Sequence, residues 1–280
     1  MERMERMESM VRLVRPLRWI MALSLGLVVL VAAASGSVAD RDLARLFAEA
    51  GVTGTIVIER ADGKARYVHN AARAGRALPV ASTFKIFNSL IALEERVIAG
   101  ADDIFKWDGK IHSIQDWNRD QTLRSAYRVS CVWCYQELAR RIGSERYRQH
   151  LRRAGYGSLS EPFNLTRFWI DGSLRLSAHD QVTFLRRLID RSLPYRAESY
   201  ETLRELMLVN SGPQIAYRLR AKTGWSTIGT PGVGWYVGYV ETHKDVWIFA
   251  LNIDVKSEKD LPVRIDLARA ALRVKGILPE

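Results

Sequence analysis

Val80-Ala81-Ser82-Thr83-Phe84-Lys85-Ile86-Phe87-Asn88-Ser89-Leu90 is the stretch on which the fold assignment depends, because it opens the clearest helical pattern in the first half of the chain. Ser82 and Lys85 are three positions apart and would share one helix face, with their Cβ atoms about 5–6 Å apart. The first turn of a helix also offers free N–H groups to a developing negative charge. The pair could therefore be a nucleophile and its base. The alternative is an ordinary helix start with a solvated lysine, since about one Ser-x-x-Lys is expected by chance in a chain of this length.

The composition indicates a globular protein. The chain has 280 residues, of which 48% are hydrophobic and 26% charged, so disorder is not expected. This length allows one large domain or two modest ones. The formal net charge of +11 is spread thinly and forms no basic run interleaved with aromatic residues, so we expect no nucleic-acid partner.

The N-terminus has the pattern of a targeting segment. Arg12, Arg15 and Arg18 precede an apolar run over residues 19–34, which is short for a membrane span. We predict a signal peptide over residues 1–39, cleaved after Ala39, and a mature domain over residues 40–280. The expected location is the periplasm, with no stable membrane insertion after cleavage. An uncleaved membrane anchor is the alternative.

Cys131 and Cys134 are the only cysteines. Two cysteines cannot complete a four-ligand zinc site, and no histidine cluster lies nearby in the sequence, so we expect no metal. An exported chain permits disulfides. A local Cys131–Cys134 disulfide and two buried free thiols both remain open.

The periodicity predicts an α+β fold. Helices are expected over residues 40–50, 123–129, 132–142, 145–154, 177–188, 200–208 and 261–275, besides the one that opens near Ser82; strands are expected over residues 54–60, 65–69, 216–222, 234–241 and 246–253. Ser177-Ala178-His179-Asp180 has the pattern of a capping box. Because strands at both ends enclose a helical middle, we predict one antiparallel sheet built from the two ends of the chain and an inserted helical subdomain.

Three further short motifs could carry chemistry. Lys222-Thr223-Gly224-Trp225 ends a predicted strand, where lysine and threonine could hold an anion and glycine would let an extended substrate approach the backbone. An ordinary turn is the alternative. Ser130-Cys131-Val132 begins a predicted helix, so Ser130 could also be a simple N-cap. Tyr156-Gly157-Ser158 reads as a turn.

Taken together and in this order, these motifs resemble those of the class D (oxacillinase-type) serine β-lactamases. The related class A set contains a Ser-Asp-Asn element that this chain lacks. Further similar stretches are Phe105-Lys106-Trp107-Asp108-Gly109, Tyr135-Gln136-Glu137-Leu138-Ala139-Arg140, Phe168-Trp169, Gly234-Trp235-Tyr236-Val237-Gly238 and Leu261-Pro262-Val263-Arg264. The resemblance covers residues 41–280. It implies a serine β-lactamase/penicillin-binding-protein-like fold, with an antiparallel sheet flanked by helices and a helical subdomain.

The resemblance implies that Ser82 attacks the β-lactam carbonyl and forms an acyl-enzyme. Lys85 would be the base, but a lysine with a pKa near 10.4 is protonated, so burial must favour the neutral amine. In the family the neutral amine captures CO2 and becomes N6-carboxylysine, and CO2 or bicarbonate is the only added requirement. Trp169 would hydrogen-bond this group, with Phe84 and Val132 keeping its surroundings apolar.

The resemblance also implies roles for the remaining motif residues. Ser130 would pass a proton to the leaving lactam nitrogen. Lys222, Thr223 and Arg264 would hold the substrate carboxylate, beside Gly224, and the N–H groups of Ser82 and Trp225 would form the oxyanion hole. The expected partners are small β-lactam molecules, and the protein would be a monomer or a homodimer.

The chain departs from the family pattern at three positions. Ser158 stands where asparagine is usual, and Phe87 stands where proline is frequent, which could reshape the groove beside Ser82. Cys131 fills the variable position of Ser-x-Val, so a disulfide to Cys134 would stiffen the turn that carries Ser130.

Two other functions compete with hydrolysis. One is a β-lactam-sensing domain, which is acylated but does not turn over; the single apolar run and the lack of a His-Glu-x-x-His motif speak against it. The other is a peptidoglycan transpeptidase or carboxypeptidase, which normally lacks the apolar Ser-x-Val and Phe-Trp elements. No Gly-x-Ser-x-Gly motif suggests a different hydrolase.

Overall fold

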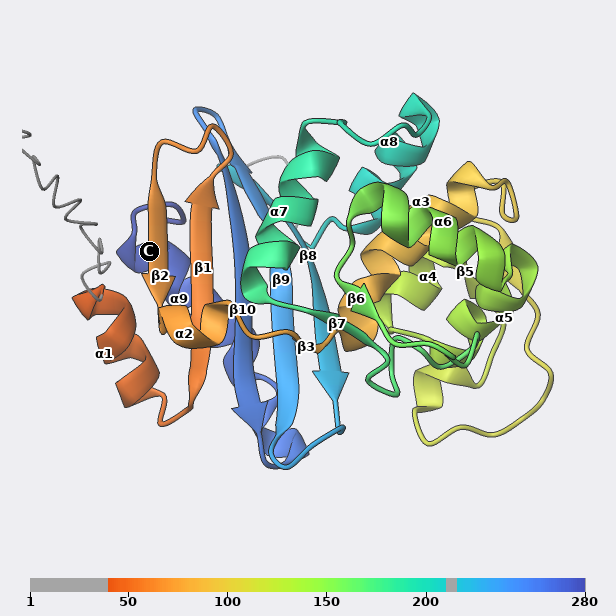
Figure 1. Ribbon diagram of the computed structural model, residues 1–280, viewed down its shortest axis with the longest axis horizontal. Helices are drawn as coiled ribbons and strands as arrows, with labels where there is room; N and C mark the ends of the chain where they lie inside the picture. Colours follow the sequence, from red (N-terminus) through yellow and green to blue (C-terminus); the bar gives the residue numbers. More distant parts are fainter. Residues whose placement is uncertain (1–39, 210–215, 280) are drawn as a thin grey trace, which may run out of the picture. The chain divides into compact units, whose positions relative to one another are not determined.

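A five-stranded antiparallel sheet, in the order β2-β1-β10-β9-β8, forms the centre of the computed structural model (Figure 1). The structure describes residues 40–209 and 216–279; the predicted signal peptide lies outside these residues. The strands are β1 (Gly54–Arg60), β2 (Arg66–His69), β8 (Tyr217–Ser226), β9 (Gly232–Thr242) and β10 (Val246–Val255). Because β1 pairs with β10, the two ends of the chain share one sheet, which confirms the predicted topology.

Both faces of the sheet are covered. α1 (Arg41–Glu49) and α9 (Val263–Val274) pack on one face, where the core includes Leu43 and Leu272. α7 (Ala178–Ile189) covers the opposite face (Figure 1). The predicted capping box is present at its start, since Ser177 Oγ accepts from the Asp180 N–H at 3.0 Å and Asp180 accepts from the Ser177 N–H at 2.8 Å. Double coverage explains why β9 is buried over its first nine residues instead of alternating.

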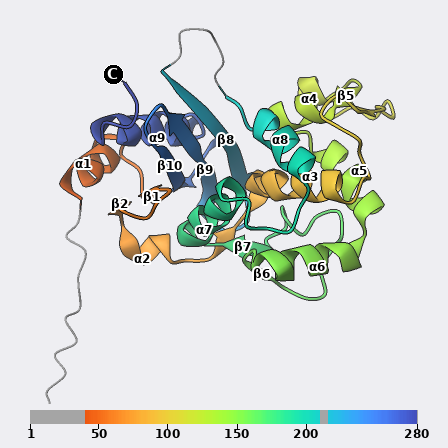
Figure 2. The same cartoon turned by 90° about the horizontal axis from the view of Figure 1, so that it is seen from above.

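The predicted helical subdomain lies beside β8, the edge strand (Figures 1 and 2). It consists of α3 (Lys85–Glu94), α4 (Leu123–Arg128), α5 (Val132–Ile142), α6 (Ser144–Ala154) and α8 (Ala197–Leu206). The first nine residues of α3 are buried, so this helix is the core of the subdomain. Short elements complete the described chain: α2 (Ala71–Ala74), β3 (Leu78–Pro79), β4 (Ile104–Phe105), β5 (Gln121–Thr122), β6 (Ser158–Leu159), β7 (Leu174–Leu176), η2 (Gln115–Trp117) and η3 (Glu258–Asp260). In the described part of the chain, no helix is both long and apolar enough to cross a membrane.

Several predicted boundaries were wrong. Ser82 lies in a 3₁₀ turn, η1 (Ala81–Phe84), and the α-helix begins only at Lys85. Ala81, the first residue of η1, has φ +49°, a conformation that a sequence pattern does not reveal. β8 continues to Ser226, four residues beyond the predicted end, because Trp225 and Ser226 still pair with β9. α8 begins at Ala197 instead of residue 200.

Candidate active site

Ser82 and Lys85 are in direct contact at the junction of η1 and α3. Lys85 Nζ donates to Ser82 Oγ at 3.0 Å. The Lys85 side chain is fully buried, whereas Ser82 is partly exposed. Burial lowers the pKa of Lys85 well below its ordinary value, and the nearby charge of Lys222 lowers it further. The site therefore favours a neutral amine next to the hydroxyl.

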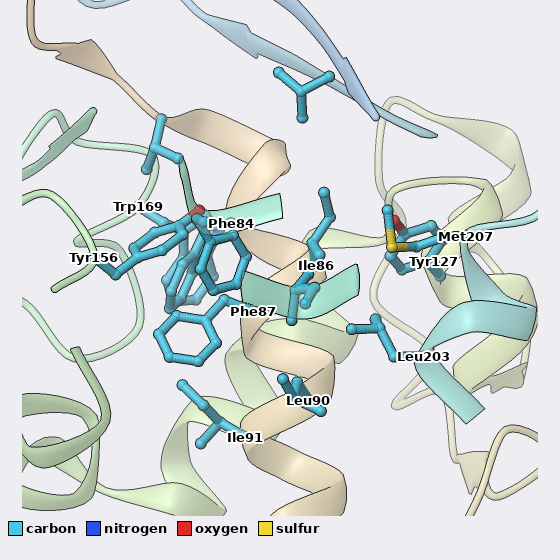
Figure 3. Close-up of a cluster of buried hydrophobic side chains, with 14 of the residues drawn as sticks. Phe84, Ile86, Phe87, Leu90, Ile91, Tyr127, Tyr156, Trp169, Leu203 and Met207 are labelled. Atoms are coloured by element: carbon cyan, nitrogen blue, oxygen red, sulfur yellow. The ribbon is translucent and has the colours of Figure 1, made fainter. Parts of the chain in front are cut away.

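Aromatic side chains surround this pair. Lys85 Nζ lies 4.9 Å from the centre of the Tyr135 ring, and Tyr135 is held by a 2.7 Å hydrogen bond between its hydroxyl and Ser89 Oγ. Phe84 and Trp169 are both buried, with ring centres 6.1 Å apart. Figure 3 shows Phe84, Tyr156 and Trp169 gathered on one side of α3, with Tyr127 and Met207 on the other. Lys85 thus lies at the start of a largely apolar interior.

Trp169 has a buried indole N–H with no hydrogen-bond partner. A buried donor without an acceptor costs about 1–3 kcal/mol, so such a group calls for an explanation. An acceptor within hydrogen-bond reach of this N–H would satisfy it.

Ser130 occupies a constrained turn between α4 and α5. Its φ is +58°, a left-handed conformation that is uncommon for a residue with a side chain. Its N–H donates to Tyr127 O at 3.3 Å, and its Oγ is buried without a partner in the structure. Val132 follows at the first position of α5 and is partly exposed. Of the two alternatives that the sequence left open, the structure contains the Cys131–Cys134 disulfide and not two free thiols.

Lys222 lies on β8 and is buried, with 4% of its surface exposed. Burial, together with the charge of Arg264, lowers its pKa from 10.5 to about 7. Its Nζ donates to the Thr223 carbonyl oxygen at 3.2 Å and lies 5.6 Å from the centre of the Tyr127 ring. Lys222 can therefore gain or lose a proton near neutral pH.

Arg264 reaches the same region from α9. Its Nη1 donates to the Gly224 carbonyl oxygen at 3.0 Å, and its buried Nε has no hydrogen-bond partner. Burial lowers the pKa of Arg264 to about 10, so the guanidinium stays charged at neutral pH. It can still offer a donor to an anion.

Gly224 packs against the turn that carries Ser82. A Cβ atom at this position would lie 3.0 Å from Thr83 Cγ2 and 3.2 Å from both the Thr83 nitrogen and the Val80 carbonyl oxygen. The missing side chain therefore makes room for this turn and lets β8 approach η1 closely.

β8 is the edge strand of the sheet, and its outer edge lies beside this turn. The Ala221 N–H donates to Met207 O at 2.9 Å, and Leu219 O accepts from the Val209 N–H at 2.9 Å. The backbone N–H and C=O groups of odd-numbered residues in β8 therefore point to the outer edge. Because alternate residues of a strand point to the same edge, the N–H groups of Thr223 and Trp225 face outward as well. The Trp225 side chain is 36% exposed. An extended ligand could pair with this edge.

The structure brings Ser82 and Lys85, at the junction of η1 and α3, next to β8 at Gly224 and next to α9 at Arg264. Lys222 is close enough to Lys85 to lower its pKa, and Trp169 lies near Phe84. The Ser130 N–H donates to Tyr127 O, and the Tyr127 ring centre lies 5.6 Å from Lys222 Nζ, while Val132 begins α5. Sequence reasoning assigned no role to Tyr127 and Tyr135, whose rings lie near Lys222 and Lys85 respectively. Spacing alone does not separate such rings from ordinary core aromatics. Among residues 40–209 and 216–279, no cluster of three or more His, Cys, Asp or Glu could hold a metal ion.

Comparison with known proteins identifies the family. Residues 49–273 match the penicillin binding protein transpeptidase domain. The chain is 37% identical to β-lactamase OXA-10 of Pseudomonas aeruginosa over 235 residues, which are 83% of this chain and 88% of that protein. It is 38% identical to β-lactamase OXA-48 of Klebsiella pneumoniae over 233 residues, 83% of this chain and 87% of that protein.

A solved structure gives the class. The class D β-lactamase YbXI from Nostoc superimposes with a TM-score of 0.81 and 41% identity, covering 84% of this chain and 99% of that one. The chain belongs to the class D serine β-lactamases. A second class D β-lactamase, FUS-1 (OXA-85) from Fusobacterium nucleatum, superimposes on this enzyme with a TM-score of 0.82 and 31% identity, covering 86% of this chain and all of that one. The family assignment and the serine β-lactamase/penicillin-binding-protein-like fold predicted from the sequence are both confirmed. A class D β-lactamase is a serine enzyme and needs no metal or organic cofactor.

Proposed function

We propose that this class D β-lactamase opens the β-lactam ring by attack of Ser82 Oγ and then hydrolyses the resulting ester. The observation that carries the proposal is the 3.0 Å contact between Ser82 Oγ and the amine of a fully buried Lys85. Burial suppresses the ammonium form, and a neutral base next to a hydroxyl can activate it. The hydrolysis product lacks antibiotic activity, so the reaction confers β-lactam resistance.

The neutral Lys85 amine is also the form that can take up CO2 to give N6-carboxylysine. The surroundings suit such a group, because the buried Trp169 N–H lacks an acceptor and the neighbouring Phe84 ring excludes water. When present, the carboxylated lysine would supply a general base for acylation and for deacylation. Trp169 would hold it by hydrogen bonding.

In acylation, Ser82 Oγ bonds to the lactam carbonyl carbon, and the C–N bond of the ring then breaks. The N–H groups of Ser82 and Trp225 would stabilise the developing oxyanion; the outward direction of odd-numbered N–H groups on β8 supports this role for Trp225. Ser130 would deliver a proton to the leaving nitrogen. Lys222, whose pKa is about 7, can replace the proton that Ser130 gives up.

Substrate orientation rests on the cations around β8. Thr223 Oγ1 and the Arg264 guanidinium would hold the carboxylate that penicillins and cephalosporins carry, with Lys222 contributing charge. The free Arg264 Nε supports this role, since one guanidinium donor is already used on the Gly224 carbonyl. Val132 and Trp225 would line the groove with apolar surface. In deacylation a water molecule attacks the ester carbonyl, and Ser82 Oγ regains its proton as the product acid leaves.

Turnover of a chromogenic cephalosporin, with and without added bicarbonate, tests the proposal. We expect many turnovers per enzyme and an increase of the rate with bicarbonate. Stoichiometric acylation without turnover would instead support the β-lactam-sensing alternative, which the relatives named as β-lactamases do not favour.

The cellular setting is part of the proposal. Residues 1–39 would be a signal peptide and residues 40–280 the periplasmic catalytic domain, acting as a monomer or a homodimer on small β-lactam molecules and on no nucleic acid. Asp40 supports this boundary from the mature side, because its carboxylate accepts from the Leu43 N–H at 3.2 Å and caps α1. N-terminal sequencing of the exported protein should begin at Asp40.

A further inference from the structure

Ser130 follows the C-cap of α4 and has φ +58°, a conformation that costs about 1–3 kcal/mol and persists only when its surroundings fix it. Two backbone hydrogen bonds close this turn: the Ser130 N–H donates to Tyr127 O at 3.3 Å, and the Cys131 N–H donates to Ala126 O at 2.9 Å. The Ser130 side-chain oxygen makes no hydrogen bond. Restraint beyond the two backbone bonds therefore comes from neighbouring residues.

The next residue, Cys131, is the N-cap of α5. An N-cap usually accepts a hydrogen bond from the third residue of the helix through a side-chain oxygen. Here Cys131 Sγ takes that position and accepts from the Cys134 N–H at 3.2 Å, but sulfur is a weak acceptor. The covalent bond between Cys131 and Cys134 joins the same two positions. The disulfide thus adds a covalent bond between the two residues that this weak cap joins.

The far end of the disulfide is anchored on the helix that carries Lys85. Cys134 is followed by Tyr135, whose hydroxyl is 2.7 Å from Ser89 Oγ on α3. Both cysteines are fully buried. Tyr135 therefore fixes the first turn of α5 relative to α3, and the disulfide links the Ser130 turn to that fixed point.

Two tryptophan hydrogen bonds hold the same turn from outside. Trp117 Nε1 donates to the Val129 carbonyl oxygen at 3.0 Å, and Trp133 Nε1 donates to the Trp117 carbonyl oxygen at 3.0 Å. These contacts restrain the residues on both sides of Ser130, in addition to the hydrogen bond from the Cys131 N–H to Ala126 O. The disulfide is the one covalent restraint in the described chain.

We infer that the Cys131–Cys134 disulfide is a positioning device for Ser130, which holds its hydroxyl in place for proton delivery during acylation. The inference rests on the proposed function of Ser130. It makes Cys131 and Cys134 positioning residues, and it predicts that the disulfide controls the acylation rate as well as stability.

A double-mutant cycle on the acylation rate constant tests the inference. C131A/C134A should slow acylation by a chromogenic cephalosporin about tenfold, because displacement of a catalytic group by about 1 Å can cost up to about a hundredfold. In a Ser130→Ala background the same pair should change the rate less than about twofold, since the group being positioned is gone. Equal effects in both backgrounds would overturn the inference.

Two matched variants separate positioning from stability. C131S/C134A restores an oxygen cap without the covalent bond. Compared with C131A/C134A, we expect it to regain most of the lost thermal stability, while its acylation stays at least about fivefold slower than that of wild type. Full recovery of the rate would show that the covalent bond is dispensable. Leu272→Ala, in the core against α9, should lower the Tm without changing the acylation rate. Failure of the wild type to be acylated at all would instead refute the proposed function. If the wild type is acylated but does not turn over, the acylation rate constants of the double-mutant cycle can still be measured and compared.

Discussion

Gly224 and Thr83 approach so closely that a Cβ atom on Gly224 would lie 3.0 Å from Thr83 Cγ2. The contact joins β8, which carries Lys222 and Trp225, to the turn that carries Ser82. The distance between the nucleophile and the strand therefore depends on the absence of one methyl group.

Gly224→Ala should displace β8 from η1. Overpacking of this kind costs about 1–3 kcal/mol, and we expect kcat/KM to fall by about a hundredfold because the oxyanion donors separate. Thermal unfolding and steady-state kinetics measure both effects. Gly75→Ala is the control, since Gly75 has a φ of −88° and nothing within 4 Å of a Cβ atom; an equally large loss there would show that the effect is not local.

Lys85→Ala should remove the base without removing the nucleophile. Because general-base catalysis contributes about 10²–10⁴-fold, we expect kcat to fall by a factor in that range or by more. Added bicarbonate should not restore the activity, whereas it should restore that of wild-type enzyme exposed to acid. Rapid-quench kinetics with a chromogenic cephalosporin measures the rates, and normal turnover by the variant would rule the mechanism out.

Trp169→Phe should make the enzyme depend more strongly on bicarbonate. The change keeps an aromatic ring and removes a buried N–H that has no partner in the protein. Activity at ambient CO2 should fall about tenfold and recover at high bicarbonate, since one hydrogen bond to a charged group contributes about 1.5–3 kcal/mol. Trp235→Phe is the matched comparison, because the Trp235 N–H already donates to Pro79 O at 2.8 Å. Trp235→Phe should lower the Tm and leave the bicarbonate dependence of activity at the wild-type level. An equally increased bicarbonate dependence in both variants would contradict the role of Trp169.

Lys222 links stability to pH. Its pKa is about 7 in the folded protein and 10.5 as its ordinary value, so between these values the unfolded chain binds a proton that the folded protein does not. The free energy of unfolding should therefore rise with pH across this window, with up to about 1.4 kcal/mol per pH unit from this residue.

Denaturant unfolding of Lys222→Met checks this slope. The variant should lose the Lys222 contribution to the pH dependence of the free energy of unfolding. It should be more stable than wild type near pH 7, while its kcat/KM is strongly reduced. Lys256→Met, at an exposed position, should keep the wild-type slope. An unchanged slope in Lys222→Met would show that burial does not lower its pKa.

The sequence predicted the sheet built from both chain ends because strand-forming stretches bounded by turn residues are a local signal, although coverage of both faces removes strict alternation of burial from β9. The resemblance to a known family predicted that the motifs form one site, and the contacts of Lys85 with Ser82 and of Gly224 with Thr83 and Arg264 agree with it for those residues. The sequence missed the 3₁₀ turn at Ser82 and the left-handed φ of Ala81, since neither has a periodic signature. It did not reveal that Gly224 packs against Thr83, because close approach between distant segments is a tertiary property.

The same limit explains the rings beside the lysines. Tyr135 belongs to a motif by sequence, yet its position 4.9 Å from Lys85 Nζ depends on how α5 packs on α3. Likewise, the sequence placed Cys131 and Cys134 one helical turn apart, but it could not show that both cysteines are buried, Cys131 as the N-cap of α5 and Cys134 in its first turn.

The state of Lys85 is the central claim, and ¹³C NMR of the enzyme in ¹³C-labelled bicarbonate tests it most directly. We predict one protein-bound carbamate signal in wild type that is absent from Lys85→Ala, disappears on acidification in parallel with activity, and returns with bicarbonate. Full activity in wild-type enzyme that shows no such signal would contradict the account.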